Sequence, residues 1–264
     1  MGENRARVFF GTELRRKREA AGLTGKQLAD ALGCTPQWIS TMESGRKVSE
    51  QSAIDLDTYF KTDGYFHRTW KLANELELQT HLPPGFTEYA EREKDASSIR
   101  VYSALLLSGL FQTPDYARAI ISADRATGVN EVVEKRIERQ AVLLRDPPPF
   151  VWFTIDETVL HRSIGNREVM RQQLSFLLEL DQSPNIMINV VPQSAGYHAG
   201  LGGSFQILSF QGSDLAYSEA AGVGTLISRP DRVAGFVVRW DMIRAHALPI
   251  AESRTMIRSV MESL

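Results

Sequence analysis

Cysteine is almost absent from this sequence, because Cys34 is the only one among 264 residues. This excludes a framework of disulfide bonds and is typical of proteins of a reducing cytosol. The sequence also has no apolar run of the length that crosses a membrane, and it has no signal-peptide pattern. We therefore expect a cytoplasmic protein that has no membrane partner.

Motifs of metal and phosphate chemistry are missing as well. The five histidines are scattered and form neither an H-E-x-x-H motif nor a Cys/His cluster with metal-ligand spacing. No glycine-rich phosphate loop follows an expected strand. The Gly-Gly-Ser segment at 202–204 lacks the flanking glycine of a nucleophile elbow and precedes a strand instead of following one. We predict no metal site, no cofactor and no catalytic residue.

One pair of carboxylates leaves an enzymatic function open as an alternative. Asp156 and Glu157 are the residue types of an acid/base pair, but adjacent carboxylates at the end of a strand more often cap the next helix. The alternative requires that two residues among Asp156, Glu157, His161 and His198 share a cleft.

Two short helical segments joined by a tight turn stand out near the beginning of the chain, between residues 23 and 45. Thr24 and Gln27 have the spacing of a capping box, in which two side chains satisfy free backbone groups at the start of a helix. Gly33 suits the left-handed residue that ends a helix. Thr35 then restarts the pattern as an N-cap, with Pro36 at the first helical position, where a missing N–H costs nothing.

The second of these helices has an apolar and a polar face. Ile39, Met42 and Trp38 are predicted to point inward. The residues predicted to face outward are Gln37, Ser40, Thr41 and Ser44. Helices over 8–21 and 50–60, the latter capped by Ser49, supply the rest of a small core. Its expected members are Phe10, Leu14, Ile54 and Leu56.

The segment from residue 7 to about 62 resembles the lambda-repressor-like, or XRE-type, helix-turn-helix family. The resemblance is carried by Leu14-Arg15, Arg18, Gly22-Leu23-Thr24, Leu28-Ala29, Leu32-Gly33, Thr35, Ile39-Ser40 and Met42-Glu43-Ser44-Gly45. It implies an all-α domain that binds double-stranded DNA. It also implies an internal ion pair between Arg18 and Glu43, which would make both residues structural.

The same resemblance implies which residues face the DNA. Those expected at base edges or the adjacent backbone are Thr35, Pro36, Gln37, Ser40 and Thr41. A glutamine at position 37 can read adenine through two hydrogen bonds, whereas serine and threonine discriminate less between bases. The alternative is a four-helix adaptor that packs against another protein, with its polar face merely solvated.

Contacts to the DNA backbone are expected from cations that flank this element. The family often has glutamine at the position of Gly25, so one side-chain anchor is missing here. Lys26, Arg46 and Lys47 are the better phosphate candidates, and Gln27 completes the predicted DNA-binding set.

The charge of the chain predicts weak binding by a single copy. The net charge is −2, but residues 1–62 hold ten Lys/Arg against eight Asp/Glu, a net of +2, which leaves −4 for the rest. Because phosphate neutralisation supplies much of the affinity for a duplex, we expect a homodimer on a two-fold site.

The remaining two thirds of the chain mix expected helices and strands. We predict a helical linker over 63–97 and an α+β regulatory domain over 98–264. Expected helices are 114–122, 129–144, 168–180, 231–246 and 250–264, and expected strands are 150–155, 185–191, 204–210 and 215–219. Periodicity does not decide whether 99–107 is a strand or a buried helix.

This second region resembles the C-terminal domain of actinobacterial WhiJ-like or antitoxin-like regulators. The resemblance rests on residues 108–119, Arg136-Ile137-Glu138-Arg139-Gln140, Asp156-Glu157, Val191-Pro192, Gly196-Tyr197-His198 and Gly203-Ser204-Phe205. It implies a transcription regulator that is often encoded beside a small partner protein. An antitoxin-like protein that mainly sequesters such a partner is the alternative.

Effector sensing is a further expectation for this region. The glycine-rich 192–203 loop joins two apolar strands and suits closure over a small molecule or a peptide. It is equally explained as a wide connection that needs glycine for backbone reasons. The sequence does not decide whether Arg136, Arg139 and Gln140 support the core or form part of an interface.

Overall fold

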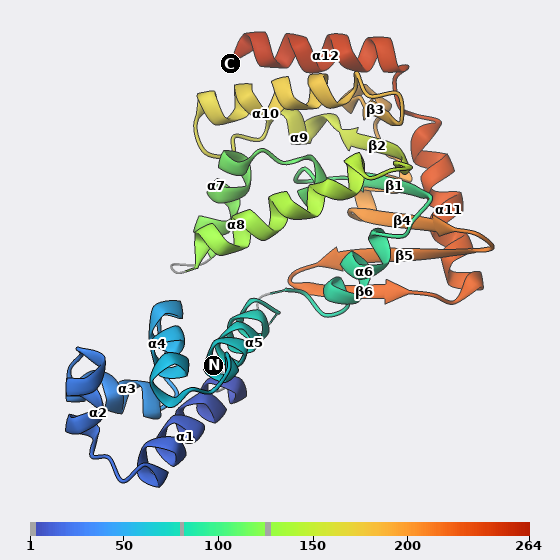
Figure 1. The fold of residues 1–264 in the computed structure, drawn as a ribbon. Helices are drawn as coiled ribbons and strands as arrows, with labels where there is room; N and C mark the ends of the chain where they lie inside the picture. The colour runs from blue at the N-terminus through green and yellow to red at the C-terminus, as the bar shows by residue number, and fades with distance from the viewer. Residues whose placement is uncertain (1–3, 80–81, 125–127) are drawn as a thin grey trace. The chain divides into compact units, whose positions relative to one another are not determined.

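The computed structural model describes residues 4–79, 82–124 and 128–264. The chain forms two compact units, Met1–Leu82 and Pro83–Leu264 (Figure 1). The first unit is all helical, and the second combines helices with one six-stranded sheet. The predicted fold class, an all-α domain followed by a mixed α and β domain, is confirmed.

Side-chain caps set the beginnings of the helices in the first unit. The described helices are α1 (Arg5–Ala20), α2 (Gly25–Leu32), α3 (Pro36–Glu43), α4 (Glu50–Phe60) and α5 (Tyr65–Gln79). Asn4, Thr24, Thr35 and Ser49 each accept a backbone N–H of the helix that follows. These short polar side chains replace hydrogen bonds that the first turn of a helix cannot make itself.

The core of the first unit contains Leu14, Leu28, Ile39 and Leu56, all at most 1% exposed. Ile54, which we expected in this core, is 38% exposed. The inward face of α4 instead carries Ala53 and Leu56, which are three residues apart and therefore share one side of the helix. Ile54, the residue after Ala53, lies on a different side of the helix.

The segment 63–97, expected as a linker, is divided between the two units. Helix α5 belongs to the first unit, where Phe66 is fully buried and its ring lies edge-on to Phe10, with centroids 5.3 Å apart. Asp57 fixes the entry to α5 by accepting the backbone N–H groups of Phe66 and His67. Helix α6 (Phe86–Glu93) belongs to the second unit. Aromatic side chains on one face of α5 pack in the core of the first unit, so this unit extends well past residue 62.

The sheet of the second unit has the strand order β3-β2-β1-β4-β5-β6. Its strands are β1 (Ser98–Ser103), β2 (Phe150–Asp156), β3 (Ile186–Val191), β4 (Phe205–Phe210), β5 (Ser213–Ala220) and β6 (Val223–Ile227). β1, β2 and β3 are parallel, and β4 to β6 form an antiparallel meander. The undecided segment 99–107 therefore begins as a strand, buried at the centre of the sheet.

Strand β6 was not expected from the sequence. It pairs with β5 through a two-residue turn, Ala221 and Gly222, both with positive φ. A turn of this kind matches the right-handed twist of two antiparallel strands. The strand is short and contains Gly224, which explains why its pattern is weak in the sequence.

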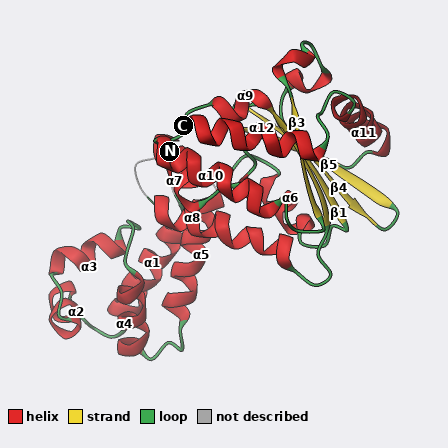
Figure 2. Ribbon diagram, turned by 90° about the horizontal axis from the view of Figure 1, so that it is seen from above, coloured by secondary structure: helices red, strands yellow, loops and turns green. Residues whose placement is uncertain are grey.

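Helices cover both faces of the sheet (Figure 2). The helices on one side are α7 (Pro114–Asp124), α8 (Val129–Glu138), α10 (Arg167–Leu180) and α12 (Ile250–Ser263), and α11 (Pro230–Arg244) lies on the other. A short helix, α9 (Glu157–His161), follows β2 directly. The expected helix 129–144 ends at Glu138 and continues as a 3-10 helix, η2 (Arg139–Leu144). Short 3-10 turns also occur at η1 (Gly109–Phe111), η3 (Gln193–Ala195) and η4 (Ala199–Gly202).

Two apolar layers hold this unit together, one on each face. Phe153 and Leu174 belong to the layer under α10, and Phe205 and Trp240 belong to the layer under α11. Within the described ranges, no helix has the length and apolar character that crossing a membrane requires.

Candidate functional site

Helix α3 presents a polar face outward from the first unit. Its inner side chains, Ile39 and Met42, are each 1% exposed. On the opposite side Gln37 and Ser40 are exposed, and Thr41 is half-buried. In the part of the chain that the structure describes, the side chains of Gln37 and Ser40 make no internal hydrogen bond, so their polar groups are available to a ligand.

The turn before α3 has the predicted geometry. Gly33 has a φ of 65°, the left-handed value that ends α2. Thr24 and Gln27 form the predicted capping box, in which the Gln27 side-chain oxygen accepts from the Thr24 N–H at 2.8 Å. The Thr35 hydroxyl accepts from the Trp38 N–H at 3.2 Å. Two of the predicted DNA-binding side chains, Gln27 and Thr35, thus use an oxygen to start a helix.

A two-pronged ion pair ties α3 to α1. The Arg18 guanidinium donates to both Glu43 oxygens, at 2.6 and 3.0 Å, and also to the Leu23 carbonyl at 2.9 Å. Both charged side chains are largely buried, at 13% and 14% exposure, which confirms their predicted structural role. The hydrogen bond with Glu43 raises the pKa of Arg18, so its charge is secure.

A close backbone contact sets how α3 lies on α1. Gly11 is buried, and a Cβ at this position would lie only 2.5 Å from the Glu43 carbonyl oxygen and 2.7 Å from that of Met42. Gly45, just after α3, has a φ of 73° and lies against the backbone of Val8. The end of α3 therefore rests on a part of α1 that has no side chain to separate them.

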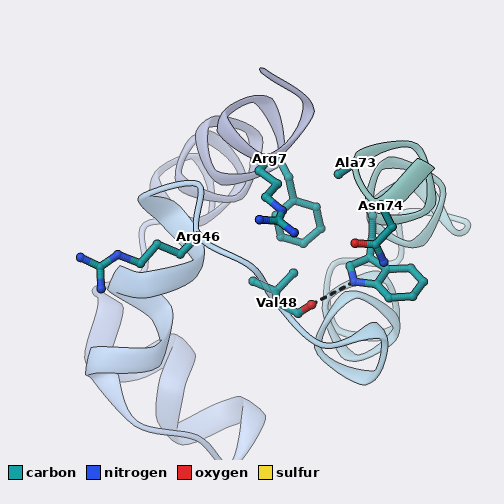
Figure 3. Close-up of a pocket in the computed structure, with 7 residues that line it drawn as sticks. Arg7, Arg46, Val48, Ala73 and Asn74 are labelled. Carbon is teal, nitrogen blue, oxygen red and sulfur yellow. Dashed lines mark hydrogen bonds between the residues drawn. The ribbon is translucent and has the colours of Figure 1, made fainter. Parts of the chain in front are cut away.

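The cations predicted to contact phosphate lie at the two ends of this element. Lys26 is exposed at the start of α2, and Arg46 and Lys47 are exposed in the connection from α3 to α4. This connection is held by the Trp70 indole N–H, which donates to the Val48 carbonyl at 3.0 Å. Figure 3 shows that hydrogen bond beside a small hollow, with Arg46 extending away from it. Helix α5 thus supports the segment that carries two of the predicted anchors.

The sequence favours packing of the aromatic side chains of this segment on a neighbouring domain, but it does not show that they hold the connection after α3. The signal was the spacing of Phe66 and Trp70, which puts two aromatic rings on one face of a helix. Both residues lie in the expected linker, and the structure places them in the first unit, where Phe66 is fully buried and Trp70 holds the connection that carries Arg46 and Lys47.

Comparison with known protein families matches both units. A helix-turn-helix domain model matches residues 10–65. A model described as a domain of unknown function (DUF5753) matches residues 86–259, well over half of the chain. The chain belongs to the DUF5753 family. No curated protein and no solved structure matches it. The combination indicates a helix-turn-helix regulator that binds DNA, as predicted in outline.

The DUF5753 domain brings together two residues that we considered for chemistry. Asp156 caps α9 by accepting the Thr158 N–H, as the sequence suggested, and its other oxygen lies 3.2 Å from His198 Nε2. His198 is 4% exposed and Asp156 is 6% exposed. Glu157 and His161 form a separate, more exposed pair at 3.4 Å. Among the described residues no group of His, Cys, Asp and Glu has the arrangement of a metal site.

The basic cluster of the DUF5753 domain supports its core. Arg139 donates to both oxygens of Glu93, which is fully buried, and Arg136 donates to Gln112. Gln140 donates to the Gln112 carbonyl at 2.7 Å. Of the two readings that the sequence left open for Arg136, Arg139 and Gln140, these contacts favour support of the core.

Proposed function

We propose that the protein is a sequence-specific, DNA-binding transcription regulator that acts in the cytoplasm. The observation that supports this most is the two-sided α3. Its apolar side is locked into the first unit, and its exposed polar side carries Gln37 and Ser40 between exposed cations. A helix presented in this way fits the major groove, where side-chain amides and hydroxyls read base edges.

Reading and anchoring fall to different residues in this proposal. Gln37, Ser40 and Thr41, with Thr35 and Pro36 at the start of α3, read bases or the adjacent backbone. Lys26, Arg46 and Lys47 contact phosphates, and the remaining amide group of Gln27 contributes from α2. The XRE-type assignment of this unit, and the WhiJ-like or antitoxin-like assignment of the DUF5753 domain, belong to the same proposal.

Two copies are proposed to bind together. The charge of +2 over residues 1–62 supports only weak binding to a duplex, so a homodimer on half-sites about one helical turn apart supplies the affinity. We propose that the second unit sets this pairing and responds to an effector or a small co-encoded partner. It carries large exposed apolar side chains suited to contacts, Tyr197, Leu201, Val238 and Met242.

The decisive experiment is footprinting of the full chain on its own promoter region, with and without a co-encoded partner. A protected site with two equivalent half-sites is expected. If no site is protected under either condition, the proposal fails. Sedimentation of the free protein and of the complex tests the dimer separately.

Substitutions then separate reading from anchoring. Gln37→Ala is expected to relax sequence preference and to cost about 1–3 kcal/mol at one base pair. Arg46→Ala should weaken binding to all sequences and lower the salt slope by about one. Gln51→Ala and Arg68→Ala change exposed residues of the same types on α4 and α5 and should leave both quantities unchanged. If Gln37→Ala and Arg46→Ala behave alike, the two roles are wrongly assigned.

A further inference from the structure

The 192–203 loop of the second unit has exposed side chains on both sides of one buried histidine. Tyr197 is 86% exposed and Leu201 is 58% exposed, whereas His198 between them is 4% exposed. The loop contains the short turns η3 and η4 and connects β3 to β4. A single polar side chain is therefore inserted from a loop into the body of the domain.

His198 is held there by one hydrogen bond and by one close contact with a carboxylate. Its Nδ1 accepts the backbone N–H of Gly200 at 3.2 Å, and its Nε2 lies 3.2 Å from an oxygen of Asp156. Because Nδ1 acts as an acceptor, the ring proton is assigned to Nε2, which faces the Asp156 carboxylate. The other Asp156 oxygen accepts the N–H and the hydroxyl of Thr158, at 3.0 and 2.6 Å. The Asp156 carboxylate is thus also held by contacts that do not involve the loop.

Tyr102 forms the surface on which the loop rests. Its hydroxyl donates to Asp156 at 3.4 Å, and its ring lies edge-on to His198. A Cβ at Gly200 would lie 2.3 Å from the Tyr102 hydroxyl oxygen, so the loop backbone contacts this ring directly. Burial and the neighbouring Asp156 raise the pKa of Tyr102, and its hydroxyl therefore keeps its proton. A second tie joins the start of the loop to the domain, because the Gln193 N–H donates to Glu157 at 2.7 Å.

These contacts lie at the carboxyl edge of the parallel strands. Asp156 ends β2, Tyr102 is next to last in β1, and the loop leaves from the end of β3. From β1 the chain adds β2 and β3 on one side of the sheet and then β4 on the other side of β1, so the direction of strand order reverses at β1. In open sheets of mixed α/β proteins, this edge at such a reversal is where ligands bind. Leu105, 61% exposed just after β1, adds another apolar side chain to the same edge.

We infer that the 192–203 loop is a latch, closed by the insertion of His198 between Asp156 and Tyr102. When it opens, it uncovers a carboxylate and a phenol hydroxyl above an apolar floor that includes Phe205. The sheet keeps its strands when this happens, because the ties of the latch are side-chain contacts and not part of the strand pairing. Only the regulatory use of the latch rests on the proposed function.

Hydrogen exchange on the full chain without DNA tests this directly. Gly200→Ala forces a Cβ into Tyr102, whereas Gly202→Ala, two residues along, places its Cβ 3.4 Å from the nearest atom, the end of the flexible Arg239 side chain. We expect Gly200→Ala to speed exchange of loop amides about tenfold or more, while the β3 and β4 peptides stay protected and Gly202→Ala resembles the parent. Equal loss of protection in loop and strands would overturn the inference, as would no change in the loop.

The role of His198 is tested by two substitutions in the same measurement. His198→Ala removes the contacts of this side chain with Gly200 and Asp156, and it should speed hydrogen exchange of the loop amides as Gly200→Ala does. His198→Gln retains a donor for Asp156 and should restore part of the protection. His67→Gln, which replaces a histidine paired with a carboxylate in the first unit, is the control and should leave the loop unchanged. If His198→Ala leaves the loop protected, or if glutamine restores nothing, the Asp156 tie does not close the loop. Footprinting of the same variants reports on DNA binding independently.

Discussion

Replacing Gly11 by alanine tests the idea that a contact without an intervening side chain positions α3. A Cβ at Gly11 would lie 2.5 Å from the Glu43 carbonyl oxygen and 2.7 Å from that of Met42. Ordinary van der Waals contact of a Cβ begins at 3.4 Å, so α1 and the end of α3 must separate by about 0.9 Å. Both atoms are backbone, and neither can rotate away.

The free-energy change follows from two opposing effects. Overpacking of this kind costs up to about 3 kcal/mol, and alanine is a better helix former than glycine by about 1 kcal/mol. We therefore expect Gly11→Ala to lower the stability of the first unit by about 2 kcal/mol. That loss corresponds to a roughly thirtyfold rise in exchange of core amides that open by global unfolding of this unit.

Hydrogen exchange of α1 and α4 peptides in the full chain measures this effect, because the second unit serves as an internal reference. Gly235→Ala, within α11 of the second unit, is the control, because a Cβ there meets nothing within 4 Å. It should leave exchange of the α1 and α4 amides unchanged and raise the stability of the second unit by about 0.5–1 kcal/mol. If Gly11→Ala is as stable as the parent, the contact does not set the position of α3. Reduced DNA binding by the folded variant would show that the helix has moved.

Two other predictions concern single side chains. Glu93→Gln should lower the stability of the second unit by about 3 kcal/mol in chemical denaturation, because it leaves the Arg139 guanidinium without its buried carboxylate. Glu91→Gln, on the exposed side of α6, is the control and should change the stability by at most about 0.5 kcal/mol. Equal effects of the two substitutions would refute the argument. Burial raises the pKa of the Cys34 thiol, so a smaller fraction is thiolate at pH 8 than for an ordinary cysteine. Alkylation of Cys34 at pH 8 should therefore be several-fold slower in the folded protein than in urea, and equal rates would contradict it.

Prediction from the sequence succeeded where neighbouring residues decide the structure. The capping box of Thr24 and Gln27 and the left-handed Gly33 depend on groups within four residues of one another. The start of α4 at Ser49 is of the same kind. The pair of Arg18 and Glu43 spans 25 residues and came instead from the family resemblance.

Other features could not be predicted because partners distant in sequence decide them. Periodicity gave an apolar segment at 99–107, but a central place between β2 and β4 makes it begin as a strand. The sequence leaves open whether Arg139 supports the core or forms an interface, and its contact with Glu93, 46 residues earlier, makes it internal. Ile54 has the composition of a core residue and is exposed, because packing selected the face of α4 that carries Ala53.

By itself, then, the sequence determined the two-helix element between residues 23 and 45, since its caps and turn are local hydrogen bonds and backbone preferences. Tertiary structure decided which contacts hold that element in place and which contacts hold the 192–203 loop of the second unit. Trp70 reaches Val48, and His198 reaches Asp156, across 22 and 42 residues of chain. Contacts of this length form only when the core brings their elements together, so no pattern of neighbouring residues reveals them.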